Sequence, residues 1–126
     1  MAIELQLMNL DLVIAKLSEY NQLDDLIDKA KFVSLTKSGD ELSLVIDREN
    51  LPDHQFANEG WKAFKIIGPL DFSLVGILQQ VIKPLSEKGI SIFTISTFDT
   101  DYILVKNEQI DMAIEVLKEK FKINKL

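Results

Sequence analysis

The second half of the chain switches between two hydrophobic periods, and this switch limits the folds open to it. Apolar residues first form a short run that is typical of a strand, and then recur every three or four positions, as on one face of a helix. The same two patterns then follow a second time along the chain. The expected order is strand 61–67, helix 74–85, strands 90–96 and 102–105, helix 110–121 and a short last strand at 121–123. This β-α-β-β-α-β order predicts an antiparallel sheet with both helices on one face, a ferredoxin-like α+β fold.

Residues at the helix ends support this assignment. Asp71 is placed to cap the first helix, and Gly89 is placed to end it. Pro84 lacks a backbone donor, so a kink or an early helix end is expected there. Asn107 is expected to cap the second helix.

The first half of the chain has a different order of predicted strands and helices. Alternating or apolar runs predict strands, Gly39 predicts a tight hairpin turn, and one short helix fits between. The expected elements are strands 3–7 and 12–17, helix 23–27, and hairpin strands 32–36 and 41–46. Residues 47–59 lack an apolar period and are interpreted as a linker. We therefore expect a ββαββ module at 1–59, linker included, and a βαββαβ module at 60–126.

Apolar residues fall on both faces of the strands predicted at 90–96 and 102–105, so the sheet needs a cover on its second face. Either the first half of the chain or another subunit can supply that cover.

The sequence also contains a weak internal repeat, because Phe32, Thr36 and Asp40 recur as Phe93, Thr97 and Asp101 at a shift of 61 residues. If it is not chance, it indicates a duplicated strand–turn–strand site.

Composition excludes several classes of protein. The chain has no cysteine, which rules out disulfides, thiol catalysis and zinc–thiolate sites. The one histidine, His54, lies in the predicted linker, and no metal cluster or phosphate loop is apparent, so no cofactor is expected. The acidic first half of the chain disfavours the binding of nucleic acid. The N-terminus lacks the features of a signal peptide and no apolar run reaches membrane length, so we expect a cytoplasmic protein with no membrane partner.

Two loops carry the candidate chemistry. The segment 68–76 joins a strand to a helix N-terminus, where free backbone N–H groups can bind a carboxylate. The segment 96–102 is rich in hydroxyl and carboxyl groups, and Asp99 and Asp101 offer partners for a cation. The simpler alternative is structural, with Asp71 as a helix cap, Gly76 as a packing contact and the second loop as an ordinary turn.

Segments 68–78, 89–93 and 96–102 together resemble the ACT domain family, in particular the CASTOR-type ACT proteins and the regulatory ACT modules of aspartate kinases. Segments 34–36 and 41–45 resemble the first module of small bacterial two-module members. The resemblance implies two tandem ACT modules that bind an amino acid and do not catalyse a reaction. The ligand-binding residues that it implies are Asp71, Phe72, Ser73, Leu74, Gly76, Thr97, Phe98 and Asp101.

The roles implied by the resemblance follow from chemistry. The backbone N–H groups of residues 71–74 would hold the ligand carboxylate, Asp101 would pair with a cationic group, and Phe72 and Phe98 would form an apolar wall. A cationic amino acid such as lysine or arginine is slightly favoured, and a homodimer is expected to complete the site. A ligand-free protein-interaction module is the main alternative. A small enzyme using Asp71, Asp99 or Asp101 ranks last, because no activating partner is apparent.

Overall fold

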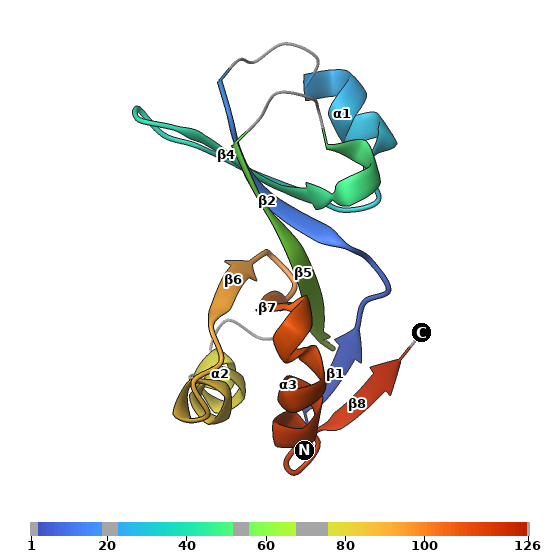
Figure 1. Ribbon diagram of the computed structural model, residues 1–126, viewed down its shortest axis with the longest axis vertical. Coiled ribbons are helices and arrows are strands. Elements are labelled where there is room, and N and C mark those ends of the chain that lie inside the picture. The colour runs from blue at the N-terminus through green and yellow to red at the C-terminus, as the bar shows by residue number, and fades with distance from the viewer. Residues whose placement is uncertain (1–2, 19–22, 52–55, 68–75, 126) are drawn as a thin grey trace. The chain divides into compact units, whose positions relative to one another are not determined.

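The computed structural model describes residues 3–18, 23–51, 56–67 and 76–125 of the chain (Figure 1). Its contacts divide the chain into two compact units. The middle unit is Leu10–Trp61, and the terminal unit combines Met1–Asn9 with Lys62–Leu126. The expected division after residue 59 differs from this one chiefly at the N-terminus, because the first strand belongs to the terminal unit.

The terminal unit contains five strands and two helices among its described residues. They are β1 (Glu4–Leu7), the later part of β5 (Phe56–Ile66), α2 (Ile77–Glu87), β6 (Ile92–Ser96), β7 (Asp101–Lys106), α3 (Ile110–Leu117) and β8 (Lys122–Lys125). The strand order is β6-β7-β5-β1-β8. The β6–β7 pair is antiparallel, as expected for a hairpin. Strand β1, which was expected in the first module, instead pairs antiparallel with β5 and parallel with β8. The mixed α+β class predicted from the hydrophobic periods is confirmed.

One core holds the terminal unit together, and it explains why both helices lie on one face. Side chains from three strands pack with the inward faces of the two helices, and nearly all are fully buried. They are Leu5, Phe64, Ile66, Ile103 and Val105 from the strands, Val81 and Leu85 from α2, and Ala113 and Leu117 from α3. Leu104 is also fully buried although it alternates with Ile103 and Val105, so β7 carries buried apolar groups on both faces, as its sequence indicates.

The helix ends differ from expectation at three positions. The N-cap of α2 is Gly76 rather than Asp71, since the helix starts at Ile77. Helix α2 continues past Pro84 to Glu87, because a proline near the end of a helix disrupts few backbone bonds. Asn107 does not cap α3; it begins the 3₁₀ turn η2 (Asn107–Gln109), which leads into the helix. The prediction for Gly89 is confirmed, because this residue has a φ of 73° just after the helix.

The middle unit contains β2 (Leu12–Leu17), α1 (Leu23–Lys29), β3 (Val33–Lys37), β4 (Leu42–Asp47), the 3₁₀ turn η1 (Arg48–Asn50) and the first part of β5. Its strand order is β3-β4-β2-β5. The segment interpreted as a linker is partly strand, because β5 begins at Phe56. Residues 56–58 are exposed and pair with β2 through their backbones, so backbone bonding rather than apolar burial makes them a strand.

The two units repeat one arrangement at a shift of 59 residues. Hairpin pair Val33–Ile46 in β3–β4 corresponds to Ile92–Val105 in β6–β7, and both hairpins have four-residue loops. Each loop is closed by the same backbone bond, from Ser38 N to Glu41 O at 2.9 Å and from Thr97 N to Thr100 O at 2.8 Å. The shift of 61 suggested by the internal repeat in the sequence is therefore wrong, since it would equate a strand residue, Thr36, with a loop residue.

A buried carboxylate holds the end of β4 in the middle unit. Asp47 is 2% exposed, and its side chain accepts hydrogen bonds from Lys31 N (2.9 Å), Phe32 N (3.2 Å) and Asn50 Nδ2 (2.6 Å). Burial raises the pKa of Asp47, but these hydrogen bonds to the charged form outweigh burial, so its pKa lies below the ordinary value. Its stabilising contribution is present above the unfolded pKa of about 4 and is lost as pH falls through the native value.

We predict that Asp47→Ala lowers the free energy of unfolding at neutral pH by about 2 kcal/mol, because two backbone donors and one amide lose a charged partner. The measurement is urea unfolding at pH 7 and again near pH 2. The exposed variant Asp40→Ala serves as the control and should change little. The deficit of Asp47→Ala should shrink as the pH falls toward the native pKa of Asp47, because the wild-type carboxylate is then progressively protonated; a deficit independent of pH would contradict this role.

Candidate functional site

The β6–β7 loop is a tightly bonded turn. The Thr97 hydroxyl donates to the Thr100 carbonyl oxygen (3.1 Å) and accepts from Thr100 N (3.2 Å), in addition to the backbone bond between the same residues. Hydroxyls that bond to the backbone in this way favour turns over continued strand. Thr97, predicted as a ligand-binding residue, therefore has a structural role in shaping the loop.

Thr100 anchors this loop to the end of β5. Its side chain is buried, and its hydroxyl donates to the carbonyl oxygen of Ile66, the last residue of the strand. The next residue, Ile67, donates its N–H to Glu4 O at 2.9 Å, which fixes the same strand end from β1. The hairpin loop thus lies beside Ile66, close to the last described residue before Gly68 in the chain, and this end of the hairpin is called here the hairpin corner.

Asp101 supplies a carboxylate at the hairpin corner. Its Oδ1 atom accepts a hydrogen bond from the Ser96 hydroxyl across the hairpin, and its side chain is partly exposed. An ionised carboxylate has about four acceptor sites, so one hydroxyl leaves capacity for a cation. Phe98, in the same loop, is 82% exposed. The chemistry of this end of the hairpin is therefore anionic and aromatic.

The structure places the predicted site residues in two groups. Thr97, Phe98 and Asp101 lie together in the hairpin, and Gly76 lies at the start of α2. Four further predicted residues lie outside the described residues, namely Asp71, Phe72, Ser73 and Leu74. Thr100 was not among the predicted residues, and its only sequence signal is a hydroxyl flanked by two aspartates in a predicted turn.

Lys65 and Tyr102 were also missed by the sequence analysis. The Lys65 ammonium lies 5.9 Å from the centroid of the Tyr102 ring, within the range of a cation–π contact. The two residues adjoin Ile66 and Asp101 in the chain, and strand alternation places them on the face opposite the helices. A lysine and a tyrosine 37 positions apart give no signal of contact in the sequence.

Gly76 is explained by backbone conformation. Its φ is 80° and its ψ is 9°, in the left-handed region that favours glycine. A Cβ atom built there would meet only Gln79 Oε1 among the described residues, at 3.9 Å, which is an ordinary contact. The close approach expected from the sequence is thus not found within the described part of the chain, and the positive φ is the constraint.

We predict that Gly76→Ala destabilises the protein by about 1 kcal/mol, from backbone strain rather than from a clash. Gly39→Ala is the matched control, because a Cβ at Gly39 would lie in open space and its φ is not in the strained region. Thermal unfolding of both variants measures the difference. Equal melting temperatures for the two variants would contradict the strain argument.

We predict that Thr100→Val costs about 1–2 kcal/mol, because the buried Ile66 carbonyl loses its hydroxyl donor while the side-chain volume is kept. Thr94→Val is the control, since Thr94 lies in β6 with an exposed side chain. Chemical unfolding measures the stability, and amide exchange at Ile67 reports on the strand end directly. Unchanged stability in Thr100→Val would remove the anchor role.

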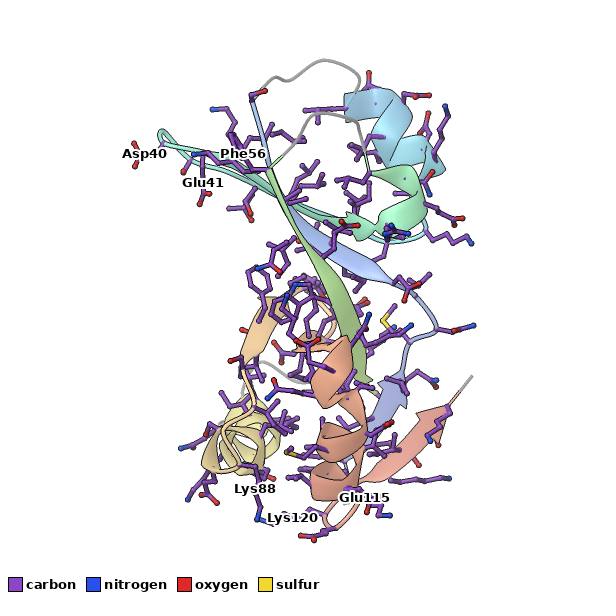
Figure 2. All side chains as sticks on the ribbon, in the orientation of Figure 1. Asp40, Glu41, Phe56, Lys88, Glu115 and Lys120 are labelled. Atoms are coloured by element: carbon purple, nitrogen blue, oxygen red, sulfur yellow. The ribbon has the colours of Figure 1, made fainter. Side chains whose placement is uncertain are left out.

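The equivalent corner of the middle unit forms a cavity of about 250 Å³. Its lining comes from the end of β2 and from the β3–β4 loop, and includes Lys16, Ser18, Ser38, Asp40 and Glu41. Figure 2 shows Asp40 and Glu41 at the tip of this hairpin. A strand end beside a four-residue hairpin loop can therefore leave space for a small molecule in this fold.

Other types of site were searched among the described residues. No group of three or more His, Cys, Asp or Glu side chains there is arranged to hold a metal ion. None of the helices in the described part of the chain is long and apolar enough to span a membrane.

An α+β fold with a loop corner of this kind has clear relatives. The family model described as ACT domain matches residues 56–119, about half of the chain. The bovine (Bos taurus) cytosolic arginine sensor for mTORC1 subunit 1 is 30% identical over 106 residues, which cover 75% of this chain and 32% of that protein. The chain thus spans about a third of the length of this curated relative.

Solved structures extend the likeness to the whole chain. An X-ray structure of a protein from Agobacterium tumefaciens aligns with a TM-score of 0.85 and 36% identity, covering 100% of this chain and 93% of that chain. The regulatory subunit of aspartate kinase from Thermus thermophilus aligns with a TM-score of 0.65 at 7% identity, covering 97% and 98%, and shows the shared fold. The chain belongs to the ACT domain family, as its sequence motifs indicate.

Proposed function

We propose that this protein is a non-catalytic, cytoplasmic regulatory module that binds a free amino acid at the hairpin corner. The observation that carries the proposal is the Thr100–Ile66 hydrogen bond, which holds the hairpin loop at the end of β5, two residues before Gly68 in the chain. The site would comprise Asp71 to Leu74 and Gly76 on one side, and Thr97, Phe98 and Asp101 on the other. The name of the bovine relative, an arginine sensor, supports the ligand class.

The proposed chemistry divides the ligand between the two loops. Backbone N–H groups of residues 71–74 would hold the carboxylate, since such groups at a strand-to-helix turn favour anions. Asp101 would pair with the cationic group, and its bond from Ser96 fixes the orientation of its carboxylate beforehand. Phe98 would cover the aliphatic part of the ligand. A cationic amino acid, lysine or arginine, fits this combination better than a neutral one.

The two compact units also support a two-module interpretation. Their hairpins share one register at a shift of 59 residues, although the family model matches residues 56–119, most of which lie in the terminal unit. We propose that each unit is one ACT module. A homodimer would supply the additional modules that complete the site.

The test is thermal unfolding of the dialysed protein with each of the twenty amino acids at millimolar concentration. A ligand at 100 times its Kd should stabilise the protein by about 2.7 kcal/mol, a shift of several degrees. We predict a shift with arginine or lysine that Asp101→Ala weakens at least fivefold in affinity, since the ligand cation loses its charged partner.

Glu87→Ala is the control for charge, because Glu87 is an exposed acid at the far end of α2. It should leave the affinity unchanged. If Asp101→Ala and Glu87→Ala bind equally well, Asp101 does not contact the ligand. No shift with any of the twenty amino acids would reject the sensor function for this chain.

Exposed aromatic side chains favour a second candidate function, that of a ligand-free interaction module. Phe98 is 82% exposed in the terminal unit and Phe56 is 80% exposed in the middle unit, where it is marked in Figure 2. Large exposed aromatics are enriched at protein interfaces. This candidate predicts a homodimer by light scattering that no amino acid stabilises, and that Phe98→Ser weakens.

A further inference from the structure

A cavity of the terminal unit lies at the carboxyl ends of the parallel strands β1 and β8. Leu7 and Lys125 are paired at these ends, and the first turns of α3 contribute to the same cavity, whose volume is about 240 Å³. Lys62 of β5 also lines it. Lys62 precedes Ile66 by four residues, about 13 Å along the strand, so this cavity is separate from the hairpin corner.

The floor of this cavity is apolar. Leu7, Ile110 and Ile114 line it, and each packs against the buried core while keeping part of its surface exposed. Exposed apolar area of this kind gains about 25 cal/mol for each Å² that a ligand removes from water. An apolar body of a ligand would therefore lie against Leu7 and the α3 face.

The charged groups at this cavity select the polar end of a ligand. Lys62 and Lys125 contribute two positive charges and Asp111 contributes one negative charge, which leaves a net charge of +1. Strand pairing explains why the two lysines lie near Leu7. Lys125 is the partner of Leu7 in β8. Phe64 is the partner of Leu7 in β5, and Lys62 is on the same face of β5 as Phe64. This balance favours an anionic group such as a carboxylate and disfavours a cation.

The volume limits the size of the ligand. A water molecule in the liquid occupies about 30 Å³, so the cavity has room for roughly eight non-hydrogen atoms. A branched carboxylic acid of five or six carbons has about this size. Most small-ligand sites combine a largely apolar wall with few polar groups, as this cavity does.

We propose that this cavity is a second ligand site, which binds a small monocarboxylate with a branched apolar body. The carboxylate lies between Lys62 and Lys125, and the hydrocarbon packs on Leu7, Ile110 and Ile114. The ligand class differs from that of the hairpin corner, so the proposal does not depend on amino-acid binding there.

The experiment is a titration of the full chain with sodium 4-methylpentanoate, followed by methyl NMR of the isoleucine and leucine side chains. We expect saturable, millimolar binding with shifts concentrated at Leu7, Ile110 and Ile114. The uncharged 4-methylpentanamide tests the carboxylate, and acetate tests the apolar body; both should bind several-fold more weakly. Equal shifts with the amide, or shifts spread over the whole core, would overturn the proposal.

Two variants test the cations. Lys125→Gln should weaken binding about 2- to 5-fold, the range for a partly exposed charge pair, and the further change Lys62→Gln should weaken it again. Lys83→Gln, on the exposed face of α2, is the matched control and should bind like the wild type. Melting temperatures verify that each variant is folded. An unchanged Kd in Lys125→Gln and in the double variant would reject the site, while the arginine and lysine screen tests the hairpin corner independently.

Discussion

Backbone pairing of β5 is the interaction on which both units depend. Its early residues pair with β2 in the middle unit, and its later residues pair with β1, where Leu5 and Ile66 are opposed and fully buried. Within the β2–β5 pair the register shifts by one residue between Leu12 and Ile14, opposite residues 58–61 of β5, and Gly60, with a φ of 88°, lies in this stretch. A bulge with a left-handed glycine is the usual way to insert one extra residue into a strand.

This bulge also determines which side chains face the core in each unit. A slip of one residue moves every side chain of a strand to the other face. After the shift, Phe64 and Ile66 point to the helices, and Lys62 lies on the same face two residues earlier. The apolar pair forms the core, while Lys62 reaches the cavity beside α3. The register of one strand therefore sets both the packing and the position of a charged group in the terminal unit.

The sequence predicted the elements well because most of them bury one apolar face. The helix α2, the β6–β7 hairpin and the β8 strand all follow from hydrophobic period. The prediction from sequence failed where backbone hydrogen bonding alone makes a segment a strand, as in residues 56–58. It also failed where strand partners are distant in the chain, as in the pairing of β1 with β8. The Thr100–Ile66 bond joins residues 34 positions apart and leaves no local pattern, so the anchor of the candidate site was not predictable.

Repetition of the fold does not imply repetition of the site chemistry. At a shift of 59, Thr100 corresponds to Glu41 and Asp101 corresponds to Leu42. Thr100 is buried and bonded to the end of β5, whereas Glu41 is exposed at the hairpin tip and Leu42 is buried in the core. The equivalent corner of the middle unit therefore lacks the carboxylate proposed to pair with a ligand cation, and its acids lie nearer to solvent.

Within the terminal unit, the two candidate sites differ in the sign of the charge that they offer to a ligand. The hairpin corner offers the Asp101 carboxylate, and the cavity beside α3 offers the ammonium groups of Lys62 and Lys125. Specificity is a difference of affinities, and charge repulsion is one of the ways in which proteins produce it. A cationic ligand is repelled by the net charge of the cavity, and a monocarboxylate is repelled by Asp101. Opposite charges at the two candidate sites therefore allow a small unit to bind two ligands without competition between them.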